Sequence, residues 1–72
     1  MPDSALQALL DPAATGAGII LKRRVDDPTG TLSSYACEGQ VGGVGKSLWV
    51  NVTTANTDAQ KNTAIRAAFN VA

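Results

Sequence analysis

The absence of histidine, together with a single cysteine, limits how a chain of 72 residues can be stabilised. A folded chain of this size buries only about 60% of the surface that its unfolded form exposes, so many such chains add disulfides, metals or partner subunits. One cysteine cannot form an intrachain disulfide, and a structural zinc site requires four Cys or His ligands. We therefore expect one small domain over residues 1–72 with no cofactor and no metal. Self-association or docking into a larger assembly would stabilise it, and a compact monomer of modest stability is the alternative.

The charge balance bears on the partners of the chain. Six basic and six acidic residues give a formal net charge of zero, whereas dedicated nucleic-acid-binding proteins are usually basic. A chain without net charge also lacks the repulsion that keeps copies apart. The partner that we expect is the chain itself or another assembly protein, with nucleic acid less favoured and with no small-molecule substrate.

The N-terminal residues lack the features of a targeting segment. The stretch Met1–Ser4 carries an acid where a signal peptide needs basic residues, and no run approaches the ~20 apolar residues of a membrane span. The lone cysteine suits a reducing compartment. We expect a cytoplasmic or virion-associated protein that has no signal peptide and no membrane segment.

The first third of the chain predicts a short helix followed by a strand. Ser4 and Gln7 match a capping box, so a helix should run from Ser4 to about Leu10 and end before Pro12. The small residues 13–18 are typical of a connector. In the strand expected over residues 19–26, alternation would place Ile19, Leu21, Arg23 and Val25 on the core face and Ile20, Lys22, Arg24 and Asp26 on the other.

Two turns predict that three strands follow one another as a meander. The segment Asp27–Gly30 fits a type I turn, because proline favours its second position and glycine its fourth. A second strand should follow over residues 31–41. The glycines in residues 42–45 then predict the turn that leads into a third strand.

The third strand, from Lys46 to Thr54, has the clearest alternation in the chain. Its aliphatic residues should face the core, and Trp49 then lies on the opposite face with polar neighbours. Three interpretations of Trp49 stay open: a core residue if the faces are reversed, a protein interface, or less often a platform for nucleic-acid bases. The aliphatic set consists of Leu48, Val50 and Val52.

A helix should close the chain. Thr57 and Gln60 form a second capping box, and the helix should run to about Asn70 with Lys61 and Arg66 toward solvent. The fold class is therefore α+β, a three-stranded antiparallel meander flanked by a short N-terminal helix and a C-terminal helix, with both helices on one face of the sheet. The apolar stripe of the closing helix would consist of Ile65, Ala68, Phe69 and Ala72.

The glycine-rich run from Gly39 to Ser47 does not match a phosphate-binding loop. Such a loop needs glycine, four residues and then Gly-Lys-Ser/Thr, but counting back from Gly45 places Gln40 where the first glycine belongs. The loop must also open a helix, whereas the residues that follow alternate like a strand. A hairpin turn accounts for the run.

No other group of residues forms a recognisable reaction centre. Cys37 and the serines have no histidine to activate them, so Cys37 is interpreted as a buried structural residue. Asp26 and Asp27 would point to opposite faces of a strand, and Asp27 has a role in the turn. We expect that the chain is not an enzyme and has no catalytic residues.

The basic triplet from Lys22 to Arg24 is the remaining candidate for contacts. In a strand it divides between the two faces, so it is interpreted as a solvated edge whose charges discourage edge-to-edge pairing. The alternative is a contact for phosphate or for an acidic partner surface. The interaction residues that we select from the sequence are Lys22, Arg24 and Trp49.

These observations favour a structural or interaction subunit without enzymatic activity, acting as a homo-oligomer or docked in a larger assembly. The composition, rich in Ala, Gly, Thr and Asn and poor in charge, resembles that of many small virion or assembly proteins of bacteriophages. That resemblance implies a virion or assembly component. The alternative is a small nucleic-acid-binding module that uses the basic strand Lys22–Arg24.

Overall fold

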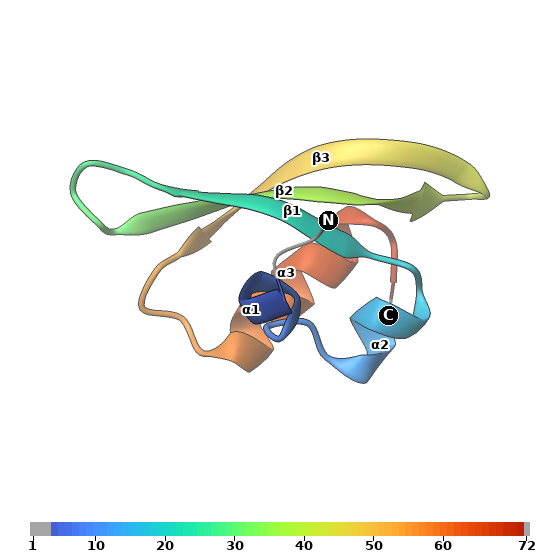
Figure 1. Ribbon diagram of the computed structural model, residues 1–72, viewed down its shortest axis with the longest axis horizontal. Helices are drawn as coiled ribbons and strands as arrows, with labels where there is room; N and C mark the ends of the chain where they lie inside the picture. The colour runs from blue at the N-terminus through green and yellow to red at the C-terminus, as the bar shows by residue number, and fades with distance from the viewer. Residues whose placement is uncertain (1–3, 72) are drawn as a thin grey trace.

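The computed structural model describes the backbone of residues 4–71 and the side chains of residues 6–71. The three strands form one antiparallel sheet in the order β1-β2-β3, and the helices lie together on one face of it (Figure 1). This arrangement confirms the predicted α+β class, the meander and the placement of the helices. The elements in chain order are α1 (Ser4–Gln7), α2 (Pro12–Gly16), β1 (Ile20–Asp26), β2 (Leu32–Val41), β3 (Val44–Thr53) and α3 (Asp58–Ala68).

Helix α2 occupies residues for which the sequence predicts a connector, so that prediction is wrong. Asp11 caps the helix by accepting a hydrogen bond from the Ala14 N–H at 2.8 Å. Pro12 begins the helix. The N–H of a first helical residue has no intrahelical acceptor, so proline at this position costs no hydrogen bond. The predicted cap of the first helix by Ser4 involves a side chain outside the described residues.

The core lies between the sheet and the helices. Val50 and Val52 of β3 are buried and Leu48 packs against the core, as the alternation predicts. Trp49 points away from them with 56% of its surface exposed, so the interpretation of Trp49 as a core residue is wrong. The other buried apolar residues are Leu10, Ala14, Ile19, Leu21, Tyr35, Cys37, Ile65 and Phe69.

A β-bulge at Lys22 changes which residues of β1 face the helices. The register with β2 shifts between Leu21 and Arg23, so that Lys22 has no direct partner. The predicted core face holds as far as Leu21, which is buried. Beyond the bulge the prediction is wrong, because Arg24 lies on the helix side and Val25 is 45% exposed on the outer face, the side of the sheet away from the helices.

Both turns of the meander form where the sequence predicts them. The Gly30 N–H donates to the Asp27 carbonyl at 3.0 Å, and the Asp27 carboxylate accepts from the Thr31 N–H at 2.9 Å. Gly42 and Gly43 connect β2 to β3 with φ values of 59° and 81°. Positive φ at both central residues is the geometry of a two-residue hairpin turn, so the glycine-rich run is a hairpin connection.

Helix α3 begins at the predicted capping box. The Gln60 N–H donates to Thr57 Oγ1 at 3.2 Å, and the Thr57 N–H donates to Gln60 Oε1 at 2.9 Å. Ile65 and Phe69 of the predicted apolar stripe are buried, whereas Ala72 is outside the described residues. The start and the buried face of this helix are therefore local properties of the sequence.

Polar side chains of α3 hold the segment between α1 and α2. Asn62 is 2% exposed, accepts from the Asp11 N–H at 2.9 Å, and donates to the Leu9 carbonyl at 2.7 Å and the Asp58 carbonyl at 2.8 Å. Arg66 pairs with the Asp11 carboxylate across 3.4 Å and is partly buried, so its predicted position in solvent is wrong. This network fixes the N-terminal helices against α3.

Candidate functional site

The bulge divides the three interaction residues selected from the sequence between two surfaces. Lys22 and Trp49 line a hollow of about 170 Å³ on the outer face, next to Glu38. Arg24 lines a groove of about 660 Å³ on the helix side, which Lys22 also borders. The structure therefore brings Lys22 near each of the others but does not bring Arg24 and Trp49 together.

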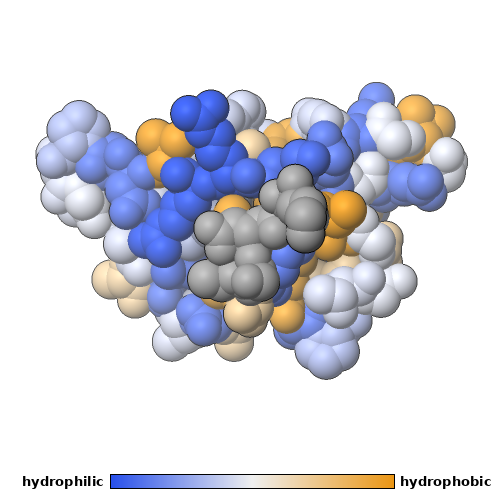
Figure 2. Space-filling model, viewed as in Figure 1, coloured by the Kyte–Doolittle hydropathy of each residue, from blue (hydrophilic) through white to orange (hydrophobic). Residues whose placement is uncertain are grey.

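The outer face carries exposed apolar side chains among polar ones. Trp49 lies opposite Ala36 of β2, and Ala36 lies opposite Arg23 of β1. Lys22 pairs with Glu38 across 3.8 Å, an exposed ion pair of the kind that contributes little to stability. Figure 2 shows apolar and strongly hydrophilic residues interspersed along the sheet side of the molecule. The large apolar residues that are exposed include Ile20, Val25, Leu32, Val44 and Trp49.

The two edges of the sheet differ in how their main-chain groups are protected. At β1 the Gln7 side chain bonds both groups of Leu21: its Nε2 donates to the carbonyl, and its Oε1 accepts from the N–H at 3.4 Å. The bulge at Lys22 follows directly. Strand β3 is ten residues long, carries Lys46 as its one charged residue, and has no strand on its outer side in the described part of the chain.

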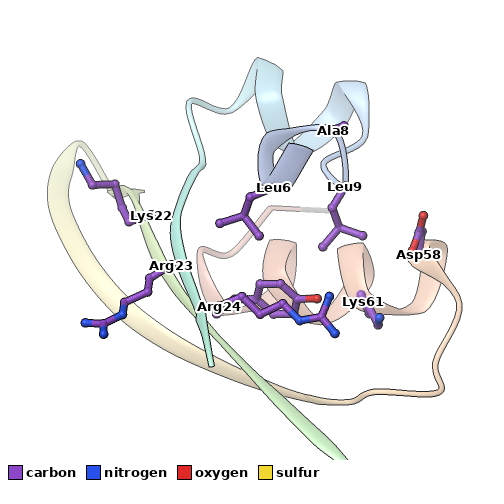
Figure 3. Close-up of a pocket in the computed structure, with 9 residues that line it drawn as sticks. Leu6, Ala8, Leu9, Lys22, Arg23, Arg24, Asp58 and Lys61 are labelled. Carbon is purple, nitrogen blue, oxygen red and sulfur yellow. The ribbon is translucent and has the colours of Figure 1, made fainter. Parts of the chain in front are cut away.

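The groove lies between α1, β1 and α3, and β1 contributes its cations (Figure 3). Arg24 extends toward Lys61 in this view, whereas Lys22 and Arg23 point to the opposite side. The Arg24 Nε donates to Asp26 Oδ1 at 2.9 Å, and this hydrogen bond raises the pKa of Arg24. Arg24 is therefore the member of the basic triplet that is held inside the groove.

Two largely buried side chains of the groove carry polar groups that reach its surface and have no protein partner among the described residues. Lys61 is 7% exposed, which corrects its predicted position in solvent, and its ammonium makes no hydrogen bond or ion pair there. Tyr35 is 1% exposed, and its hydroxyl has no hydrogen-bond partner either. Burial raises the pKa of the Tyr35 hydroxyl, which stays protonated and able to donate. The Arg24 guanidinium carbon lies 5.7 Å from the centroid of the Tyr35 ring.

The sequence spacing indicates that Lys61 lies on the buried face of its helix, but it does not indicate the contact of Gln7 with β1. Lys61 lies four residues before Ile65 and eight before Phe69, so a helix places all three on one face. Tyr35 alternates with the buried Cys37 on the helix side of β2. The contact of Gln7 with β1 joins residues that are distant in sequence, so no local pattern predicts it.

Cys37 is buried, as the sequence predicts, and its surroundings make it unreactive. It is 1% exposed, and its Sγ donates to the Tyr35 carbonyl at 3.4 Å. Burial raises the pKa of the Cys37 thiol to about 11, so the thiolate is scarce near neutral pH. Among the described residues, no three His, Cys, Asp or Glu side chains gather where they could hold a metal ion.

Within the described part of the chain, no helix has both the length and the apolar character that crossing a membrane requires. Comparison with models of known protein families, with curated proteins and with solved structures finds no match. The function is therefore inferred from the sheet edges, the outer face and the groove alone.

Proposed function

We propose that the chain is a structural subunit that pairs with a second copy of itself through the open edge of β3. The contrast between the two sheet edges carries this proposal. A long, regular edge strand with few charges is a template for pairing with another strand, whereas Gln7 and the bulge at Lys22 block the edge of β1. Because each chain has one open edge, β3 pairs with β3 about a twofold axis and the assembly closes at two copies.

The position of Trp49 supports the same arrangement. Trp49 lies near the middle of β3, so antiparallel pairing of two β3 strands brings the two indoles close together on one continuous outer face. Aromatic residues are enriched at protein interfaces. The net charge of zero adds no overall repulsion between the copies.

We propose a role without catalysis, in the cytoplasm or in a virion. The buried, protonated thiol of Cys37 supports a role without catalysis, and the composition supports an assembly component. A nucleic-acid-binding module is the second candidate from the sequence. It has less support, because the bulge directs Arg24 away from Lys22 and Arg23 and leaves no continuous basic strip.

Light scattering on a sizing column tests the pairing, and the expected mass is twice 7.4 kDa. Trp49→Lys should give a monomer, because it places two ammonium groups next to the twofold axis. Val25→Lys is the matched control, since it makes the same change on the outer face of β1. A parent protein that stays monomeric at high concentration contradicts the proposal. Loss of the dimer in both variants would show that the whole outer face makes the contact.

Amide hydrogen exchange locates the contact. Since Gly42–Gly43 is a two-residue turn, Val41 and Val44 exchange both main-chain hydrogen bonds, and alternate amides of β3 then point to the open edge. These amides should exchange slowly in the dimer and rapidly in the Trp49→Lys monomer. Rapid exchange in a dimer would place the contact elsewhere. The amides to follow are those of Ser47, Trp49 and Asn51.

A further inference from the structure

We propose that the groove between α1, β1 and α3 binds a phosphate monoester with an apolar body, whose phosphate contacts Arg24, Lys61 and the Tyr35 hydroxyl. The groove lies on the helix side of the sheet, away from the outer face. The proposal therefore does not depend on pairing through β3.

Lys61 gives the first argument for an anion. Its side chain is nine-tenths buried, lines the groove, and has no partner among the described residues. Its methylene stem is buried, while its ammonium keeps contact with solvent at the groove, as long cationic side chains commonly do. An ammonium that reaches the groove without a protein partner keeps its N–H donors available for a ligand. An anion in the groove supplies the missing partner.

Arg24 and Tyr35 add donors from the sheet. Arg24 uses its Nε and Nη2 atoms for Asp26, at 2.9 and 3.3 Å, and a guanidinium has five N–H donors, so others remain for a ligand. Asp26 and the Tyr35 ring hold the Arg24 side chain in place. The Tyr35 hydroxyl is a further donor without a partner. Two cations and a hydroxyl suit a phosphate dianion, which accepts several charge-assisted hydrogen bonds.

The electrostatic field of the groove-lining residues favours an anion. Four cations line it, and the one carboxylate among its lining residues belongs to Asp58, at the start of α3. A cleft lined mainly by one sign of charge concentrates ligands of the opposite sign. Asp58, together with Asp26 beside Arg24 and Glu38 beside Lys22, offsets three of the four positive charges and leaves an excess of one. The four cations are Lys22, Arg23, Arg24 and Lys61.

Apolar side chains indicate that the ligand is more than an inorganic anion. Leu6 and Leu9 point into the groove from α1 and the residues after it (Figure 3). The volume of about 660 Å³ lies within the range of about 300–1,000 Å³ that is typical of small-molecule pockets. The two leucines suit a short alkyl or aryl group, and the cations beside them suit the phosphate.

Calorimetry with hexyl phosphate, inorganic phosphate and hexanol tests the proposal. Hexyl phosphate should bind most tightly, because it alone uses both the cations and the leucines. The Arg24→Gln, Lys61→Met and Tyr35→Phe variants should each bind it about tenfold or more weakly, since each loses a hydrogen bond to a charged group. Lys46→Gln is the matched control, because Lys46 lies on β3 and does not line the groove, and it should bind within about threefold of the parent.

Three results would overturn the proposal. The first is no binding of hexyl phosphate to the parent protein, and the second is equal affinity for hexyl phosphate and inorganic phosphate. The third is equal weakening by Lys46→Gln and Arg24→Gln, which would indicate a diffuse electrostatic attraction instead of a site. Thermal unfolding without ligand checks that each variant folds, and hexyl phosphate should raise the melting temperature of the parent by more than that of Lys61→Met. Trp49→Lys should bind like the parent, which separates this site from pairing through β3.

Discussion

The main-chain groups at the two edges of the sheet differ in whether they are covered. Strand β1 follows helices that fold back beneath the sheet, and this return path brings Gln7 onto Leu21. Strand β3 leads through a loop to α3, which packs under the sheet and leaves the outer side of β3 without a strand partner in the described chain. Under the proposed pairing, one side-chain amide and one bulge would be enough to direct association to β3.

The largest expected effect comes from releasing the segment that holds Gln7 against β1. Asn62→Ala removes three hydrogen bonds from a buried site and leaves main-chain groups of Asp11 and Leu9 unpaired. We expect a loss of about 3 kcal/mol in the free energy of unfolding, because each unsatisfied buried group costs about 1–3 kcal/mol. Urea unfolding, followed by the fluorescence of the single tryptophan, measures this loss.

Thr63→Ala is the control for Asn62→Ala, because Thr63 is the next residue of α3 and is exposed. Thr63→Ala should lower the free energy of unfolding by no more than about 0.5 kcal/mol. If the two variants unfold alike, the Asn62 network does not hold the N-terminal segment, and another contact must keep Gln7 on β1.

The next effect compares the faces of the two edge strands. Val50 of β3 is 7% exposed, and Val50→Ala should cost about 2 kcal/mol through lost burial and a small cavity. Val25 of β1 is 45% exposed because of the bulge, and Val25→Ala should change the stability by less than about 0.5 kcal/mol. Chemical unfolding of both variants measures the difference. Equal losses would mean that the outer face near Val25 is buried in the assembled protein.

Local patterns predicted β3 and α3 well, because their determinants lie within a few residues. The capping box of Thr57 and Gln60 and the alternation around Trp49 are complete within single elements. Helix α2 had a local signal as well, the pair Asp11-Pro12 at a helix start.

The edge of β1 and the groove were not predictable from such patterns. A bulge inserts one residue and reverses the faces beyond it, so alternation placed Arg24 on the wrong side. The contact between Gln7 and Leu21 depends on how the chain returns to the sheet. Lys61 lies at the spacing of the buried stripe of α3, but its charge favours the solvent interpretation.

Opening the β1 edge should change the assembly more than the stability. Gln7→Ala removes both hydrogen bonds to Leu21 and should cost about 1 kcal/mol. With two open edges, copies can add at both sides, so light scattering should detect species larger than the dimer at high concentration. Gln40→Ala, at an exposed position of β2, is the control and should keep the mass of the parent. A Gln7→Ala protein that remains a dimer would show that the bulge alone protects β1.

The smallest expected effect separates the two hairpins by their response to acid. At the β1–β2 turn, the hydrogen bond from Arg24 lowers the pKa of Asp26, and the Thr29 hydroxyl lowers the pKa of Asp27. Both carboxyl groups then bind protons more readily in the unfolded chain than in the folded one. Their stabilisation is complete above the unfolded pKa of about 3.9 and is lost as the pH falls through the lower folded values.

The β2–β3 turn has no carboxylate, since Gly42 and Gly43 form it. On acid titration, amide NMR shifts should therefore move first around Asp26 and Asp27, while those beside Gly42 and Gly43 stay constant. Asp26→Asn with Asp27→Asn should flatten the dependence of stability on pH below about 4. If the double variant keeps the parent slope, acid acts through other carboxyl groups, and the β1–β2 turn does not account for the difference between the hairpins.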